Sequence, residues 1–156
     1  MTTMNPTTDT RPAPDGAAVL DVLGEHHAAI AAGDADRVFA LFAPDAVVFN
    51  LAPPLIAGTG SRAADIEGMR QWLTGFTAPP RLAHRDPVVH VDGDLALVHT
   101  LTSMTAEAQQ GGEFTLWFRS TYALRRTGGR WLVVHQHESV PFHMDGSFLA
   151  ATGLVP

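Results

Sequence analysis

The first half of the chain repeats apolar positions with the period of an α-helix. One such stripe spans residues 17–33 and ends at Gly33, a residue that suits the first position after a helix. Asp34 is a favourable N-terminal cap for a second, shorter helix, which ends before Pro44. The other elements predicted in this half are a strand at 46–49, an irregular crossing at 51–61 and a third helix at 65–76.

After Pro79 and Pro80 the pattern changes to the alternation that is typical of β-strands. The predicted strands are residues 82–91, 95–105, 114–126 and 131–140. Asp92-Gly93-Asp94 separates the first two strands and Gly128-Gly129 lies between the last two, so each pair is predicted to form a hairpin. Three helices followed by a meander of four long strands predict the α+β class. The helices would pack on one face of a strongly curved antiparallel sheet that encloses a pocket.

The chain is expected to form one domain with short extensions. Residues 1–16 are predicted to be a flexible leader, residues 17–141 the domain, and residues 142–156 an apolar tail. No apolar run reaches the roughly 18 residues of a membrane span, and no basic start precedes an apolar core as in a signal peptide. We therefore expect a cytoplasmic protein.

The charged residues narrow the classes of partner. The 156 residues carry a formal net charge of −6, which argues against nucleic acid or an anionic membrane as the partner. Every basic side chain is an arginine, which excludes a lysine Schiff base. The absence of cysteine excludes thiolate catalysis and zinc–sulfur sites. A small molecule remains the expected partner.

Three stretches resemble the nuclear transport factor 2-like superfamily, in particular its SnoaL-like and ketosteroid isomerase-like branch. They are AAGDAD with LFAPDA at 31–36 and 41–46, GTG at 58–60, and RST, GRW and HQHES at 119–121, 129–131 and 135–139. The last of these also resembles the association domain of calcium/calmodulin-dependent kinases. The resemblance implies a cone-shaped α+β fold with a pocket, in a superfamily that includes enzymes, binders and assembly modules.

The comparison with ketosteroid isomerase implies roles for three positions. The catalytic Asp that ends the first strand in that family corresponds to Asn50, and an amide takes up no proton at neutral pH. The family's oxyanion-binding Tyr corresponds to His26, and its second oxyanion donor, a protonated Asp, corresponds to Thr121. Steroid isomerase activity itself is therefore not expected, although donors for an oxyanion remain.

The last hairpin predicts a polar end-wall of the pocket. Trp117, Arg119 and Thr121 share one face of their strand. A two-residue turn places Arg119 opposite Glu138, whereas a three-residue turn with a glycine bulge places it opposite His137. The isomerase alignment favours the first register. Arg119 would then anchor an anionic or carbonyl oxygen and Glu138 would act as a base or orient Arg119, unless the two form a structural ion pair.

The predicted site residues fall into two groups by role. Glu138, Arg119 and His26 are predicted to be catalytic, and the predicted ligand-binding residues are Asn50, Thr121, His99, His137 and Trp117. His135 and His137 alternate along a strand as metal-binding pairs do, but Glu138 points to the opposite face from both. We therefore predict no metal site, and we expect no cofactor.

Three functions stay open at this point. The first is a cofactor-independent isomerase, cyclase or dehydratase that applies acid–base chemistry to an apolar or polycyclic substrate. The second is a binder that uses the same pocket without catalysis, and the third is a homo-oligomeric assembly module of the same fold. A homodimer is expected through the outer face of the sheet, to which we assign the row Phe114, Leu116, Phe118 and Tyr122.

Overall fold

The helices and strands follow the order predicted from the sequence. The computed structural model describes residues 14–57 and 60–156, so residues 1–13 of the predicted leader and residues 58–59 lie outside it. The elements are α1 (Pro14–Ala31), α2 (Ala35–Phe39), β1 (Phe42–Phe49), α3 (Arg62–Leu73), β2 (Arg81–Asp92), β3 (Leu95–Ala108), β4 (Gly112–Thr127) and β5 (Arg130–Ser139). Helix α1 thus begins before residue 17, and Asp34 caps α2 as expected by accepting a hydrogen bond from the backbone N–H of Arg37 at 3.0 Å.

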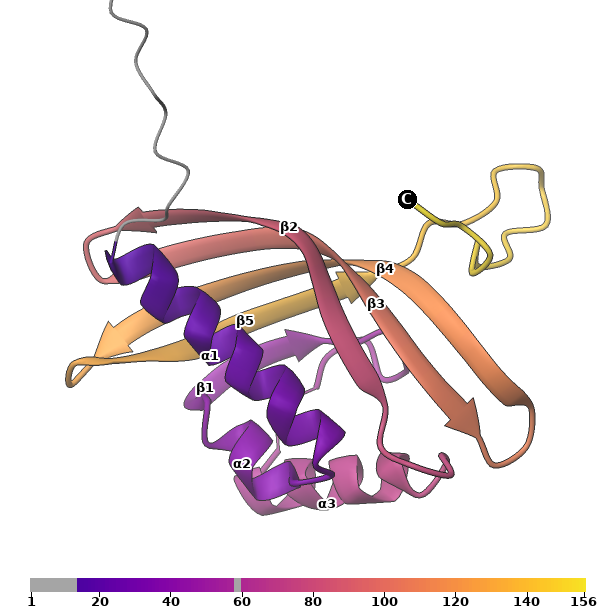
Figure 1. Cartoon of the computed structure of the whole chain (residues 1–156), viewed down its shortest axis with the longest axis horizontal. Helices are drawn as coiled ribbons and strands as arrows, with labels where there is room; N and C mark the ends of the chain where they lie inside the picture. The colour runs from indigo at the N-terminus through magenta and orange to yellow at the C-terminus, as the bar shows by residue number, and fades with distance from the viewer. Residues whose placement is uncertain (1–13, 58–59) are drawn as a thin grey trace, which may run out of the picture.

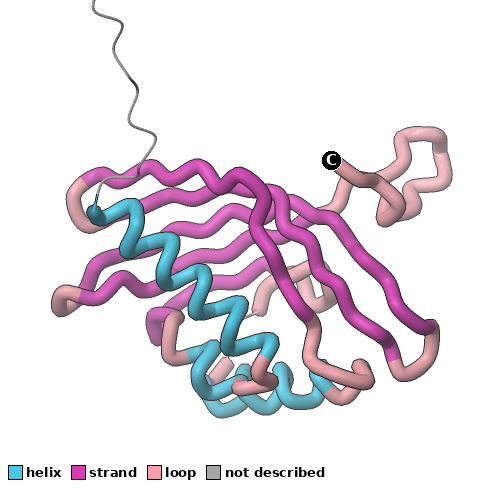
Figure 2. The backbone as a smooth tube through the Cα atoms, in the orientation of Figure 1, coloured by secondary structure: helices cyan, strands magenta, loops and turns pink. Residues whose placement is uncertain are grey.

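The five strands form one curved sheet in the order β1-β5-β4-β3-β2. Strand β1 runs parallel to β5, and all other neighbours are antiparallel. Helix α1 lies across one face of this sheet, with α2 and α3 beyond its end (Figures 1 and 2). We call the face covered by the helices the inner face and the opposite one the outer face. The predicted α+β architecture is therefore correct.

The core lies between α1 and the inner face. Val19 and Leu23 of α1 are fully buried against β3 and β4, whose even-numbered residues point inward. Phe118 and Tyr122 belong to this buried row, so their assignment to the outer, dimer-forming face is wrong. The physical reason is that α1 covers the more apolar face of β4 and so removes the larger apolar area from water.

The last hairpin combines the predicted turn with a β-bulge. Gly128 and Gly129 form a two-residue turn, and both have positive φ (58° and 78°), which glycine adopts without strain. Between the pairs Leu124↔Val133 and Ala123↔His135, strand β5 contains one extra residue, Val134. From the pair Ala123↔His135 to the strand ends farthest from the turn, the register is therefore shifted by one residue. Neither predicted register holds in this part of the hairpin.

Two arginines connect elements that are distant in sequence. Arg62, at the start of α3, donates to the backbone carbonyls of Phe39, Phe42 and Ala43 at 2.8–3.0 Å. Arg126 of β4 contacts Asp15 of α1 at 2.8 Å and also stacks on Trp131. These contacts fix the helices against the sheet. No helix of the described residues is both long and apolar enough to cross a membrane, and the cytoplasmic location stays a prediction.

Candidate active site

The structure divides the predicted site residues between the two faces of the sheet. Glu138 and His26 lie on the inner side, beneath or within the helical layer. Asn50 is exposed directly after β1. The outer face carries the others, which are Trp117, Arg119, Thr121, His99 and His137.

The predicted end-wall of Arg119 and Glu138 is wrong. Because of the bulge in β5, Arg119 pairs with Ser139, Thr121 pairs with His137, and Glu138 pairs with Ser120. Ser120 is 1% exposed and points inward, so Glu138 shares the inner face while Arg119 points to the opposite side of the sheet. The prediction that Arg119, Thr121 and Trp117 share a face is correct, but that face is the outer one.

Glu138 occupies the polar part of the inner face. Its Oε1 accepts a hydrogen bond from Nε2 of Gln136 at 2.8 Å, and its side chain is half-buried. Burial raises the pKa of the Glu138 carboxyl from 4.5 to about 7, against the opposing effect of the Gln136 hydrogen bond. A carboxyl group that titrates near neutral pH can both release and accept a proton there, which is the requirement for a general acid or base.

Asn50 lies next to Glu138 in the strand register. Strand β1 pairs Val48 with Gln136 and Phe49 with His137. Continuing this parallel register by one residue brings Asn50 level with Glu138. Val48 is buried on the inner side, and residues two apart on a strand point the same way, so Asn50 is directed to the same side as Glu138. Asn50 is therefore the first residue after β1 at the end of the sheet where Glu138 lies.

A network of buried hydroxyl groups lies on the inner face, on the strands next to Glu138. The Tyr122 hydroxyl, fully buried, is 3.4 Å from Nε2 of His84. The hydroxyl groups of Ser120 and Thr102 are hydrogen-bonded at 2.7 Å. Burial raises the pKa of the Tyr122 phenol well above its usual range, with a smaller contribution from the charge of Glu138. Tyr122 therefore stays protonated at all physiological pH values and acts as a hydrogen-bond donor.

Three histidines of the inner face are held neutral. His27 packs edge-on against His84, with ring centroids 4.1 Å apart, and His26 lies 6.5 Å from the Tyr122 ring. Burial lowers the pKa values of His26 and His84 to about 3 and that of His27 to about 4. A histidine with such a pKa is a poor base at pH 7, so Glu138 is the better proton carrier of this cluster.

Some buried polar atoms of this cluster have no hydrogen-bond partner within the part of the chain that the structure describes. They are Nδ1 of His26, Nε2 of His27 and Oε1 of Gln136. Gln136 is 5% exposed, so its free carbonyl oxygen retains hydrogen-bonding capacity next to Glu138. Among the described residues, no group of three His, Asp or Glu side chains is arranged to hold a metal ion.

Sequence reasoning missed Tyr122, His84 and Ser120. Tyr122 was placed in the dimer face, and His84 was not among the predicted site residues. The available signal was the alternation of β4, in which the even-numbered row is the more apolar one. Because helices cover the more apolar face, polar residues of that row become buried and form the candidate site.

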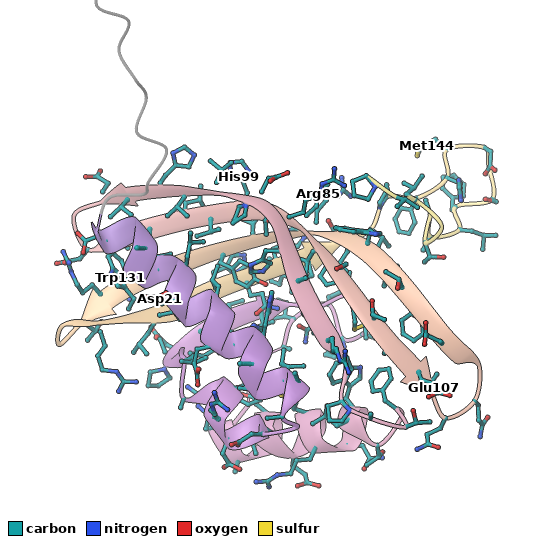
Figure 3. All side chains as sticks on the ribbon, in the orientation of Figure 1. Asp21, Arg85, His99, Glu107, Trp131 and Met144 are labelled. Carbon is teal, nitrogen blue, oxygen red and sulfur yellow. The ribbon has the colours of Figure 1, made fainter. Side chains whose placement is uncertain are left out.

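The outer face contains a separate depression. Its volume is about 440 Å³, and its lining includes the predicted residues His99, Arg119 and Thr121 together with Arg85 and Leu101. Figure 3 shows Arg85 and His99 on the side of the sheet away from α3. One predicted catalytic residue, Arg119, and two predicted ligand-binding residues, His99 and Thr121, thus line the same depression, on the opposite face of the sheet from Glu138.

A model of the SnoaL-like domain matches residues 19–143, and no curated protein matches. The fold matches an NTF2-like protein of unknown function from Pseudomonas putida KT2440, with 26% identity and a TM-score of 0.78. That match covers 91% of this chain and 96% of the other.

Two further solved structures share the fold. One, from Xanthomonas campestris, is provisionally named a calcium/calmodulin-dependent protein kinase II association domain, with 24% identity, a TM-score of 0.68 and coverage of 85% and 89%. The other, from Streptomyces avermitilis, is provisionally named a dehydratase of the NTF2-like family, with 17% identity, a TM-score of 0.73 and coverage of 85% and 100%. Identities this low establish a common fold alone.

Proposed function

The chain belongs to the SnoaL-like family, and from that premise we propose that it is a cofactor-independent enzyme that moves protons on a small apolar carbonyl compound. The observation that carries the proposal is the Glu138 carboxyl, whose pKa of about 7 lies at the working pH. The provisional dehydratase name of a structural neighbour agrees with chemistry of this class. The reaction is an isomerisation, cyclisation or dehydration that begins with proton removal.

Glu138 is the proposed catalytic base. Its carboxylate accepts a proton from the carbon next to the substrate carbonyl, and the electron pair of that C–H bond moves to give an enolate. The amide N–H of Asn50, level with Glu138, donates to the enolate oxygen. Protonated Glu138 then returns the proton to another carbon in an isomerisation, or to a departing hydroxyl group in a dehydration.

The buried groups behind Glu138 have a positioning role in this proposal. Gln136 holds Oε1 of the carboxyl through its amide N–H and offers a free carbonyl oxygen beside it. Tyr122 and Ser120 form the surroundings from which water is excluded. Burial among these groups raises the proton affinity of Glu138, whereas the hydrogen bond from Gln136 lowers it and fixes the direction of the carboxyl. Their effect on the reaction passes through Glu138. His26, predicted to be catalytic, belongs to the same buried layer.

The substrate is proposed to be apolar because the apolar side chains near α3 and the start of β4 are incompletely buried. Trp72 and Phe76 have ring centroids 5.0 Å apart, and Phe76 and Phe114 are 6.5 Å apart. No side chain of α3 is buried, although this helix carries Ile66 and Met69. Half-buried apolar side chains can still remove area from water when a hydrophobic ring binds.

The test uses 2-tetralone, a bicyclic ketone with acidic C–H groups, in deuterated water. Proton NMR measures the rate at which its C–H signals are replaced by deuterium with and without the protein. We expect exchange to be accelerated by the protein with a pH midpoint near 7, and Glu138→Gln to slow it at least about 100-fold. The matched control is Glu113→Gln, an exposed glutamate of β4 that should leave the rate unchanged.

Binding is measured separately with 2-naphthol, which has the shape of the enol of 2-tetralone. Binding of 2-naphthol without any acceleration of exchange would contradict the enzyme and favour a ligand-binding protein. A rate that falls equally in Glu138→Gln and Glu113→Gln would contradict the role of Glu138. Asn50→Leu should slow exchange without shifting the pH midpoint, because Asn50 does not itself carry the proton.

We also propose that the protein forms a homodimer through the outer face. The exposed apolar residues there that do not line the depression are Val88, Leu95 and Leu97, of which Leu95 is 54% exposed and Leu97 44%. These neighbouring side chains of β2 and β3 form a patch that a second copy would cover. This patch lies on the same face of the sheet as Arg119, whereas the row assigned to the dimer from the sequence lies on the inner face.

A further inference from the structure

We propose that the depression on the outer face is a second ligand site, which binds an organic carboxylate between Arg85 and Arg119. This site is independent of the acid–base site at Glu138, because the two lie on opposite faces of the sheet. Its ligand has a carboxylate group and an apolar body. The volume of about 440 Å³ is sufficient for a molecule of one or two rings.

The strand register brings the two arginines to the same place. Arg85 of β2 pairs with Leu101 of β3, and Leu101 pairs with Arg119 of β4. The three residues form one row across adjacent strands, with the Cα atoms of the two arginines about 10 Å apart. Both side chains are long enough to converge on one oxyanion above Leu101, whose exposed side chain supplies an apolar floor.

A second row across the sheet adds hydrogen-bonding groups. His99 of β3 pairs with Thr121 of β4, and Thr121 pairs with His137 of β5. His99 and Thr121 line the depression directly beside the arginine row. An imidazole and a hydroxyl group next to two guanidinium groups complete a set of donors suited to carboxylate oxygens.

The depression exists because β2 is interrupted there. The pairing of β2 with β3 breaks between Arg85 and Val88, and Asp86 has a positive φ of 49°. The hydroxyl group of Thr100 donates to the backbone carbonyl of Arg85 at 2.8 Å and holds this irregular segment in place. The interruption moves the β2 backbone out of the regular sheet and leaves the space between the two arginines open.

The two arginines of this region are engaged to different degrees by the described residues. Arg119 has no ion pair or hydrogen bond with any of the described residues, and Arg85 has one distant carboxylate contact, 3.7 Å to Asp86. Asp86 is 94% exposed, so this pair contributes little. Nη1 of Arg85 also donates to the carbonyl of Pro156 at 3.1 Å, which orients the guanidinium group and leaves its other N–H groups available.

This local excess of positive charge contrasts with the net charge of −6 of the whole chain. A guanidinium group keeps its charge at all physiological pH values and binds a carboxylate through two parallel hydrogen bonds. Phosphate would also fit the charge, but the apolar floor formed by Leu101 favours a ligand with a hydrophobic body. An aromatic carboxylate combines both properties.

The experiment titrates naphthalene-2-carboxylate into the isotopically labelled full chain and follows backbone amide signals by NMR. We expect the largest shifts at residues 85–86, 99–101 and 119–121, and at least about tenfold weaker binding in both Arg119→Gln and Arg85→Gln. The matched control is Arg125→Gln, an exposed arginine on the same face of β4, which should bind as the unchanged chain does. The uncharged naphthalene-2-carboxamide should bind at least tenfold more weakly than the acid.

Three results would overturn the proposal. One is equal weakening in Arg125→Gln and Arg119→Gln, which would indicate general attraction by charge. Another is equal affinity for the carboxylate and the carboxamide, or shifts centred on inner-face residues. The third is binding that follows the oligomeric state by light scattering and disappears in a monomeric Leu97→Asp variant, since the depression would then belong to the interface between copies.

Discussion

The two faces of the sheet carry similar polar residues but give them different properties. Tyr122 and Ser120 alternate with Thr121 and Arg119 along a single strand, β4. The inner residues are at most 1% exposed and belong to a network with His84 and Glu138. Arg119, one position away, is exposed and pairs with no group of the described chain. The difference is caused by the helices that cover one face.

Covering a face changes the chemistry of the groups on it. On the inner face, burial lowers the pKa values of His26 and His84 to about 3 and raises that of Glu138 to about 7. The result is one carboxyl group that can carry a proton at neutral pH among histidines that cannot. The outer face instead offers permanent positive charge, which is suited to holding an anion and unsuited to moving a proton.

The largest expected contrast between the faces is in stability. Tyr122→Ala removes a fully buried side chain and leaves a cavity, so we expect the free energy of unfolding to fall by about 3–5 kcal/mol. Arg119→Ala, on the same strand, should change it by less than about 0.5 kcal/mol. Urea unfolding followed by circular dichroism measures both. Equal losses would contradict the assignment of the two faces.

The buried histidines should make the fold sensitive to acid. Their pKa values are about 3 to 4 in the folded chain and about 6.5 in the unfolded chain, so the unfolded state takes up protons first as the pH falls. The histidines therefore do not reduce the free energy of unfolding above pH 6.5. Below pH 6.5 the free energy of unfolding falls by about 1.4 kcal/mol per pH unit for each histidine that stays neutral in the folded chain.

The variant that tests this is His26→Phe, with urea unfolding measured at several pH values between 4 and 7. Removing one neutral histidine should reduce the slope of unfolding free energy against pH by about 1.4 kcal/mol per unit. The slope is independent of any constant loss caused by the substitution. The control is His143→Phe, in the exposed tail, for which the slope should not change. A slope that His26→Phe leaves unchanged would refute the neutral buried state.

Glu138→Gln should stabilise the fold at high pH. The carboxyl has its pKa raised to about 7 in the folded chain, so its contribution is favourable below pH 4.5 and is lost as the pH rises through 7. We expect Glu138→Gln to raise the unfolding free energy at pH 8, by about 3 kcal/mol, relative to its effect at pH 4. An effect that is the same at both pH values would show that Glu138 is ionised without penalty.

A change in the outer apolar patch should affect the oligomeric state more than the stability of the fold. Leu97 is 44% exposed, so Leu97→Asp should change the unfolding free energy of the monomer by less than about 1 kcal/mol. The same change places a charge in the proposed dimer interface and should convert the dimer to a monomer by light scattering at micromolar concentration. A chain that is monomeric before the substitution would contradict the dimer.

The elements of the fold were predictable because their signals are local. Gly33 after the first helix, the Asp34 cap and the Gly128-Gly129 turn each depend on a few adjacent residues, and the structure contains all of them. The leader was predicted to end at residue 16, whereas helix α1 already begins at Pro14. The α+β class followed from the order of these elements.

The composition of the site was harder to predict because it depends on contacts between distant residues. A bulge at Val134 has no distinct sequence signal, yet it decides that Glu138 and Arg119 point to opposite faces. Which face the helices cover was predictable in principle from the apolar row of β4. That row was assigned to the dimer, so Tyr122 was not recognised as a site residue, and His84 of β2 was assigned to a strand end or the surface. Glu138 was predicted as a site residue because it is a charged residue in a largely apolar strand.

The central claim is that Glu138 titrates near neutral pH on the inner face. The direct measurement is the ¹³C chemical shift of its side-chain carboxyl between pH 4 and pH 9, assigned by comparison with Glu138→Gln. The account predicts a midpoint near pH 7, because burial raises the pKa of this carboxyl to about 7. A midpoint near 4.5, the value of an ordinary exposed glutamate, would contradict the acid–base site.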